Sequence, residues 1–335
     1  MSDFASAAMI RVIVNGMQLL GLNTSAVDLR PTQGDAQVRL DLKQQLVGSA
    51  VRQAGLSCLL KLGRGGRFNV DDPTHRALTS ARGAADLLQR WGRLERYVHS
   101  LHWVEVADLH PGGVLLRHLS RAPGAAPSAA EDLVVLGLLL ALLEAVGLHD
   151  VEAEIEGQRV FPEASESVLQ RLSQRAQTGT WFVRWRAPAQ ALAEPAARLR
   201  FSHAHAHVHV HAHVHAHVPT HLCAALPWPE IAHRCASVVL DDLMQRRTVG
   251  DVAHNIGTSA RSLQRALAVA GLSYSAVLAE ARLRAAGWWL LESTLPIAQV
   301  GFLSGYADQP HFTRDFSRRI GLAPGRYRDN FARGA

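Results

Sequence analysis

The chain has 335 residues, of which 48% are hydrophobic, and this composition describes a folded protein and excludes a largely disordered one. Its net charge is +6, and residues 226–335 hold 13 arginines against 9 acidic residues, so the basic excess per residue lies in this part. A modest excess of this kind fits contact with nucleic acid but does not by itself identify it.

The cysteines and the apolar segments of the sequence indicate in which cellular compartment the protein is located. Cys58, Cys223 and Cys235 have no CxxC spacing, which argues against a disulfide framework or a cysteine-rich zinc module. Asp3 precedes the first apolar segment and no basic region leads it, so no signal peptide is predicted. The apolar run 133–148 contains Glu144 and is short for a membrane span. We therefore expect a cytoplasmic protein.

Residues 1–200 are predicted to form a mixed α and β domain. Apolar residues follow helical spacing near the N-terminus, and Gly21 is placed to end that helix. From residue 102 the pattern alternates on both sides of His110 to Gly113, which predicts a β-hairpin. The expected helices are 4–20, 38–51, 82–101, 129–146 and 166–177, and further strands are expected at 151–156 and 181–186.

Residues 201–227 are predicted to form a histidine-rich linker between two domains. Alternation with Ala or Val would place the imidazoles on one side of an extended segment, about 7 Å apart, where neighbours can share nickel, copper or zinc. Eight such pairs, however, need a strand of about 50 Å, and repetitive runs also arise as tolerated expansions of linkers. Both interpretations stay open, and the metal-binding one uses His203, His205, His207, His209, His211, His213, His215, His217 and His221.

Residues 228–335 read as almost entirely helical after the proline-rich segment LPWPE. One amphipathic pattern covers 231–246. Thr248, with Asp251 three residues later, forms the capping-box arrangement that opens the next helix. After a turn at Gly257, Ser259 is expected to cap a helix whose Leu263 and Leu267 face inward.

The same arrangement recurs at 294–320. Gly305 suits the left-handed conformation that ends a helix, and Asp308 is placed to cap the next. Phe312, Phe316 and Ile320 fall at i, i+4 and i+8 and are predicted to form one buried stripe. Two helix-turn-helix units, 248–270 and 294–320, are thus joined by a helix over 274–291. The predicted fold class is α+β, with an all-α C-terminal domain.

Two basic helices held by a connecting helix can enter successive segments of the DNA major groove. By position, the first offers Arg261, Gln264 and Arg265 to bases. The second offers His311 and Arg314. Arginine favours guanine and glutamine favours adenine. The candidate phosphate contacts are Thr313, Ser317 and Arg318.

The C-terminal region resembles the AraC/XylS family of bacterial transcription regulators. The residues that carry the resemblance are Leu263-Gln264-Arg265 with Gly271, Arg282 with Ala285, Gly305-Tyr306-x-Asp308-x-x-x-Phe312-x-Arg314-x-Phe316, and Gly321-x-x-Pro324-x-x-Tyr327-Arg328. Gly301 stands where the family usually has Ala and is expected to weaken its helix by up to about 1 kcal/mol. Pro310 stands where Ser is frequent and removes an amide that could hold a phosphate. We therefore expect the first unit to carry at least as much base discrimination as the second.

Residues 86–103, DLLQRWGRLERYVHSLHW, look like part of the ligand-sensing domain of the family's ornithine-utilisation-regulator-like branch. The resemblance covers roughly residues 5–200. It implies that the N-terminal domain senses a small-molecule effector. For the whole chain the resemblance implies a transcription regulator that binds double-stranded DNA and is associated with the nucleoid. If the protein is an activator, RNA polymerase is also a partner. A homodimer also fits.

Three alternatives were weighed against this function. In the first, nickel or zinc at the histidine run makes the protein a metal sensor or metal-handling protein. In the second, the nine imidazoles gain charge together below about pH 6 and report acid. In the third, a fused alkyl-transfer enzyme would need an activated cysteine, yet the three cysteines have no supporting metal or histidine arrangement. The prediction is a protein that is not an enzyme and has no resident cofactor.

Overall fold

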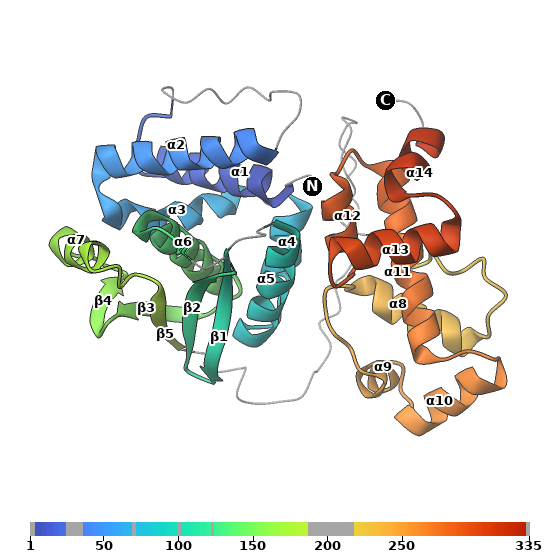
Figure 1. Ribbon diagram of the computed structural model, residues 1–335. Coiled ribbons are helices and arrows are strands. Elements are labelled where there is room, and N and C mark those ends of the chain that lie inside the picture. Colours follow the sequence, from blue (N-terminus) through green and yellow to red (C-terminus); the bar gives the residue numbers. More distant parts are fainter. Residues whose placement is uncertain are drawn as a thin grey trace, which may run out of the picture.

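The computed structural model describes residues 4–24, 36–68, 72–98, 102–121, 124–186 and 218–332, which form two parts (Figure 1). In the first part helices cover a single antiparallel sheet, and the regular elements of the second part are all helices. The predicted α+β class is therefore confirmed. Residues 203–217, which hold eight of the nine histidines of the predicted linker, lie outside the described residues.

The N-terminal part follows the predicted order of elements, with additional short helices between residues 56 and 79 and one additional strand. Strand Gln158–Phe161 was not predicted, because its four residues are too short to reveal an alternating pattern. The elements are α1 (Phe4–Leu19), α2 (Ala36–Ala54), η1 (Leu56–Cys58), α3 (Leu59–Leu62), η2 (Gly63–Phe68), α4 (Pro73–Thr79), α5 (Ala84–Val98), β1 (His102–His110), β2 (Gly113–Ser120), α6 (Ala129–Ala145), β3 (His149–Ile155), β4 (Gln158–Phe161), α7 (Glu166–Gln174) and β5 (Thr180–Arg186).

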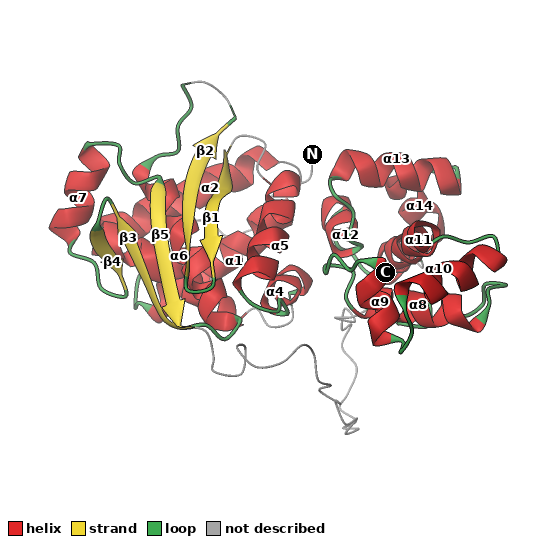
Figure 2. Cartoon of the chain, turned by 90° about the horizontal axis from the view of Figure 1, so that it is seen from below, coloured by secondary structure: helices red, strands yellow, loops and turns green. Residues whose placement is uncertain are grey.

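The sheet has the strand order β1-β2-β5-β3-β4 (Figure 2). His110 pairs with Gly113, so the predicted hairpin between β1 and β2 is confirmed. Alternate residues of β5 are buried, among them Trp181 and Val183, which places one face of the sheet in the core. Helix α6 is apolar around its whole circumference and is packed against α3 and η2 as well as β3. The apolar run 133–148 is accordingly a core helix.

The C-terminal part contains α8 (Glu230–Asp241), α9 (Val249–Asn255), α10 (Ala260–Val269), α11 (Tyr274–Glu292), α12 (Ile297–Leu303), α13 (Gln309–Ile320) and α14 (Pro324–Phe331). The prediction that the first of these helices continues to residue 246 is wrong. Asp242 has an extended backbone, and its Oδ1 accepts hydrogen bonds from the amides of Met244 at 3.0 Å and Gln245 at 3.3 Å. This side-chain turn ends α8 and directs the loop toward the N-terminal part.

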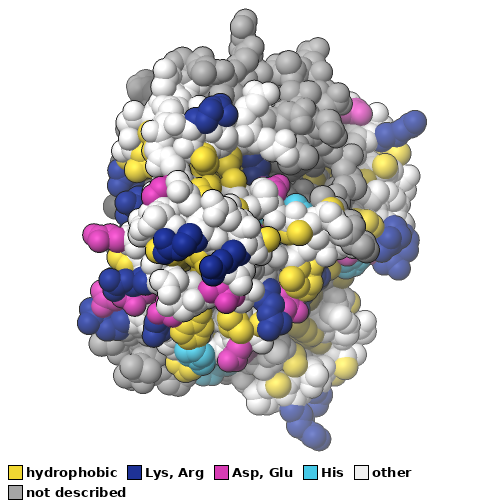
Figure 3. All heavy atoms as spheres, turned by 60° about the vertical axis from the view of Figure 1, so that its left-hand side comes forward, with side chains coloured by type: hydrophobic (Ala, Val, Ile, Leu, Met, Phe, Trp, Pro, Cys, Tyr) yellow, Lys and Arg dark blue, Asp and Glu magenta, His cyan; other side chains and the backbone are white. Residues whose placement is uncertain are grey.

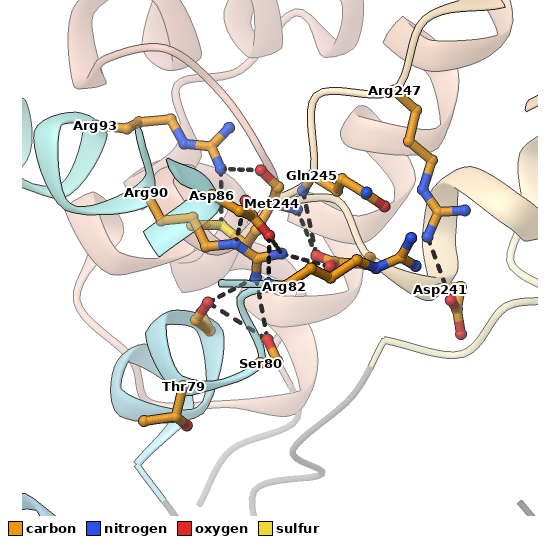
Figure 4. Close-up of polar contacts among 12 residues, drawn as sticks. Thr79, Ser80, Arg82, Asp86, Arg90, Arg93, Asp241, Met244, Gln245 and Arg247 are labelled. Atoms are coloured by element: carbon orange, nitrogen blue, oxygen red, sulfur yellow. Dashed lines mark hydrogen bonds and ion pairs between the residues drawn. The ribbon is translucent and has the colours of Figure 1, made fainter. Parts of the chain in front are cut away.

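The two parts make direct contact, and Arg90 and Arg93 of α5 contribute polar contacts to it (Figure 4). Arg90 has no exposed surface and pairs with Asp86 and, at 2.6 Å, with Asp242 of the C-terminal part. Arg93 donates a hydrogen bond of 2.7 Å to the carbonyl of Met244. Arg90 and Arg93 therefore join two segments about 150 residues apart in the chain.

Apolar packing continues across the same contact. Helix α12 lies against α1, α4 and α5, and the rings of Tyr97 and Phe302 meet edge to face at 6.1 Å. The buried residues of α12 and α13 consequently belong to the same apolar core as those of the N-terminal part. By contrast, the core of α8, α9 and α10 forms a separate cluster.

The side of the N-terminal part that carries α7 and β4 has basic and acidic side chains interspersed (Figure 3). Arg184 pairs with Glu154 on neighbouring strands, and Arg186 pairs with Asp150 at 2.9 Å. Such mixed charge lacks the single-sign character of a nucleic-acid surface.

Among the described helices, none alone is long and apolar enough to cross a membrane, and α10 with α11 meets those criteria only as a pair bent by 76°.

Candidate nucleic-acid interface

The first helix-turn-helix unit consists of α9 and α10. Thr248 and Asp251 form the predicted capping box: Thr248 Oγ1 accepts from the Asp251 amide at 3.2 Å, and the Asp251 carboxylate accepts from the Thr248 amide at 2.6 Å. Ser259 caps α10 by accepting from the Ser262 amide. Leu263 and Leu267 are fully buried against the unit's core. Sequence and structure agree throughout this unit.

The outer side of α10 carries the three predicted base-reading residues. Arg261, Gln264 and Arg265 are all exposed. None of them has a hydrogen-bond or ion-pair partner among the described residues. Their donors and, for Gln264, an acceptor are therefore available to a ligand that lies along α10.

The second unit consists of α12 and α13. Gly305 has φ of 78°, the left-handed conformation that was predicted, and Asp308 Oδ1 accepts from the His311 amide at 2.7 Å. Phe312 and Phe316 are fully buried. Ile320, predicted to complete their stripe, is 38% exposed, so this prediction is wrong. It is the last residue of α13, beyond the reach of the core.

The outer side of α13 is less uniform than that of α10. His311 and Arg314 are exposed, and Thr313 and Ser317 are half-buried. Arg314 has no ion-pair partner among the described residues, whereas the exposed Arg318 pairs with Asp315 at 2.6 Å. The ring of His311 packs edge to face on Tyr306 at 5.4 Å, which fixes its position at the start of the helix.

Helix α11 determines the spacing between the units. Its 19 residues correspond to about 28 Å of helix. Helices α10 and α13 lie toward its opposite ends (Figure 1). Tyr274 Oη donates to the Arg247 carbonyl at 2.7 Å, and Arg319 of α13 pairs with Glu280 of α11. Of the eight predicted DNA-contacting residues, three therefore lie on α10 and five on α13, and α11 connects the two units.

The remaining predicted sites are only partly within the described residues. His221 is exposed, and no group of three or more potential metal ligands occurs in the described part of the chain. Cys58, Cys223 and Cys235 are buried, and burial raises the pKa of each thiol to about 11. They are protonated near neutral pH and lack the activation of a nucleophilic cysteine.

Sequence reasoning did not find two features. One is the buried Arg90 and Arg93 on α5, whose partners are distant in sequence. The other is a cavity of about 470 Å³ in the N-terminal part, which is lined by α1, η2, α4, α5 and α6. The only sequence sign of the buried arginines was their place on the same helix as the apolar face formed by Leu87, Trp91 and Leu94.

Comparison with known proteins agrees with the C-terminal geometry. Residues 252–330 match the model of a helix-turn-helix domain family. The chain is 37% identical over 86 residues to transcriptional activator NphR of a Rhodococcus species, and this covers 26% of each chain. It is 36% identical over 77 residues to the ornithine utilization regulator of Pseudomonas aeruginosa, 23% of each chain.

The alignments therefore span about a quarter of the length of these curated relatives. A solved DNA-binding transcriptional dual regulator from Escherichia coli K-12 is 23% identical, with a TM-score of 0.30, over 31% of this chain and 94% of that one. Residues 252–330 therefore contain a helix-turn-helix domain, in agreement with the resemblance of the C-terminal region to the AraC/XylS regulators.

Proposed function

We propose that the protein is a sequence-specific transcription regulator that reads double-stranded DNA with two helix-turn-helix units. The observation that carries this proposal is the pair of helices α10 and α13, each with an exposed polar side, toward opposite ends of α11. Such a pair fits successive major-groove segments on one face of DNA, about 34 Å apart. The relatives are named as an activator and a regulator, and an activator role would make RNA polymerase a partner.

Each residue has a proposed role in this interface. Arg261, Gln264 and Arg265 read bases in one segment. In the other, His311 and Arg314 read bases. The proposed phosphate contacts on α13 are Thr313, Ser317 and Arg318, of which Arg318 must exchange its ion pair with Asp315 for the DNA backbone.

Footprinting on DNA upstream of the protein's own gene and neighbouring operons tests this proposal. We expect two protected patches about one helical turn apart. The double variant Arg261→Ala, Arg265→Ala should lose one patch, and Arg314→Ala should weaken the other. Arg171→Ala, an exposed position on α7, is the matched control and should leave both unchanged. Absence of protection on all of these fragments would contradict the proposal.

The cavity in the N-terminal part is the proposed effector site. Its walls are mainly apolar, and at its edge Arg64 pairs with Glu144 at 2.8 Å. A volume of about 470 Å³ lies in the range of sites for small ligands. The principal wall residues are Met9, Val12, Leu78, Trp91, Leu94, Leu138 and Leu142. This composition favours a small, largely apolar molecule with few polar groups.

Filling the cavity tests its role. Ala141 lines the cavity from α6 and is only half-buried, so Ala141→Phe can occupy the space without rebuilding the core. Footprints would be repeated with metabolites handled by the enzymes of the protected operon. We expect Ala141→Phe to keep the ligand-free footprint and lose the response. Ala54→Phe, at an exposed position of α2, should respond normally. An unchanged response in Ala141→Phe would place the effector elsewhere.

The histidine run supports a second proposal, in which nickel or zinc is the effector. Alternating imidazoles are good ligands for either metal. Deletion of residues 203–217 should then abolish both metal binding and any metal-dependent change in DNA affinity. If the deletion leaves both unchanged, the run is a linker expansion. We further propose that the protein forms a homodimer and acts at the nucleoid in the cytoplasm. Sedimentation of the full chain tests whether it is a dimer.

A further inference from the structure

A second, smaller cleft of about 270 Å³ lies where the two parts of the chain meet. Its walls come from α5, from the loop between α8 and α9, from α11 and from the start of α13. We call it the basic cleft, after four of its lining residues, Arg93, Arg246, Arg247 and Arg282. Figure 4 shows Arg93 of α5 reaching the loop that contains Met244 and Arg247.

The acidic groups nearby do not balance these four arginines. Asp242 lines the basic cleft, but its carboxylate pairs with Arg90 at 2.6 Å. Arg247 meets Asp241 only at 3.4 Å. Arg93 donates to the neutral carbonyl of Met244. Among the described residues, the basic cleft therefore keeps an excess of positive charge.

Burial makes this excess costly. Burial and repulsion by Arg282, in that order, lower the pKa of Arg93 to about 10. Burial also lowers the pKa of Arg282. Both groups remain charged near neutral pH, so like charges are held together in a poorly hydrated place. An anion in the basic cleft would remove much of this cost.

The hydrogen-bonding groups point to the same conclusion. The Nε atoms of Arg93, Arg247 and Arg282 are buried and have no acceptor among the described residues. Arg93 is 5% exposed, and the side chain of Arg247 is 5% exposed. Buried donors of this kind are rare unless a ligand or water accepts from them. An oxyanion supplies several acceptors at once.

We propose that the basic cleft binds a small phosphate-bearing anion that links α5 to the C-terminal part. A tetrahedral phosphate accepts hydrogen bonds from several directions, as donors on three separate segments require, and guanidinium groups match its geometry. The volume suits inorganic phosphate, pyrophosphate or a compact phosphorylated metabolite. Because Arg93 and Arg282 come from different parts of the chain, the bound anion would also stabilise their contact.

Titration of the full chain with pyrophosphate at constant ionic strength tests this proposal. We expect saturable binding, weakened about tenfold or more by Arg246→Gln and by Arg282→Gln. Arg246 is exposed in a loop, so its variant should fold normally, and circular dichroism would verify this. Arg171→Gln on α7 is the matched control and should bind like the wild type. No saturable binding by the wild type, or equal weakening in the control, would overturn the proposal.

A second arm identifies the source of the phosphate, since His311 lines both the basic cleft and the outer side of α13. The titration is repeated in the presence of a saturating DNA duplex. Persistent pyrophosphate binding supports a free phosphate-bearing metabolite. Displacement by the duplex, with a lower salt dependence of DNA binding in Arg246→Gln, supports recognition of a backbone phosphate in the same cleft.

Discussion

Gln299 of α12 donates a hydrogen bond of 2.7 Å from Nε2 to Thr74 Oγ1 of α4, and both side chains are buried. Thr74 also lines the cavity of the N-terminal part. A single side chain thus separates the proposed effector site from the first helix of the second helix-turn-helix unit. Any ligand that moves α4 would change the support of α12, and through it the position of α13.

The energetic weight of this bond can be measured with a double-mutant cycle. Thr74→Val removes the acceptor at nearly constant volume and leaves the Gln299 amide buried and unpaired. We expect it to lower the free energy of unfolding in urea by about 1–3 kcal/mol. The double variant Thr74→Val, Gln299→Leu replaces both polar partners and should be more stable than Thr74→Val alone. Strictly additive effects would mean that the bond contributes nothing to domain contact.

Gly301 illustrates how packing reverses an expectation based on helix propensity. From the sequence alone, alanine at this position should strengthen α12 by up to about 1 kcal/mol. In the structure, a Cβ at Gly301 would lie 2.8 Å from Cδ1 and 3.0 Å from Cγ of Phe312, whose ring is fully buried. We expect Gly301→Ala to destabilise the protein by about 1–3 kcal/mol.

Gly92 is the matched control for this variant. It lies within α5, where an added Cβ meets nothing within 4 Å. Gly92→Ala should therefore stabilise the protein by up to about 1 kcal/mol. Thermal unfolding of the two variants, followed by circular dichroism, should give shifts of opposite sign. Stabilisation by both substitutions would show that α12 and Phe312 repack without cost.

Glu95 should make the stability depend on pH. The residue is 4% exposed beside the cavity, and its carboxylate accepts from Trp91 Nε1 at 2.8 Å and from the Val104 amide. Burial is the largest effect and raises its pKa from about 4.5 to about 7. The native state therefore binds a proton more tightly than the unfolded chain, so the stabilisation present below pH 4.5 is lost as pH rises to about 7.

Urea unfolding at pH 5 and pH 8 tests this dependence. Between these values we expect the wild type to lose about 2–3 kcal/mol more than Glu95→Gln, which cannot ionise. Comparison with the variant separates Glu95 from other titrating groups such as His75, whose pKa burial lowers. Parallel pH profiles for the two proteins would mean that Glu95 is ionised at pH 5 in the native state.

The C-terminal units were largely predictable from sequence because their signals are local. The capping box of Thr248, the left-handed Gly305 and the cap at Asp308 each depend on residues within one or two helical turns. The end of α8 was not predictable in the same way. Asp242 interrupts a continuing amphipathic pattern, and its ion pair is with Arg90, 152 residues away.

The same distinction separates the predicted site from the unpredicted one. Outward residues of α10 follow directly from the inward positions of Leu263 and Leu267. The basic cleft instead needs Arg93 and Arg282 to meet, and nothing in either helix's own pattern indicates the other. Contacts between segments distant in the chain were therefore what the sequence could not predict. This holds for the cavity of the N-terminal part as well as for the basic cleft.

The ranking of the two units in base discrimination remains a prediction, and the structure adds a physical reason for it. Arg265 projects from α10 beside Arg261 and Gln264, all exposed and without partners among the described residues. On α13, by contrast, Arg318 is paired with Asp315, and Pro310 supplies no amide at the helix start. Arg265→Ala should cost about 1–3 kcal/mol at one base step. Its effect should at least equal that of Arg314→Ala.

Binding of each variant to operator libraries with single base changes measures this ranking. A base-reading arginine should lose discrimination at one position, whereas a phosphate contact should weaken binding to all sequences equally. Arg171→Ala again serves as the control for the purification and the library. A smaller loss for Arg265→Ala than for Arg314→Ala would reverse the order, because the unpaired donors of α10 would then lie away from the base edges.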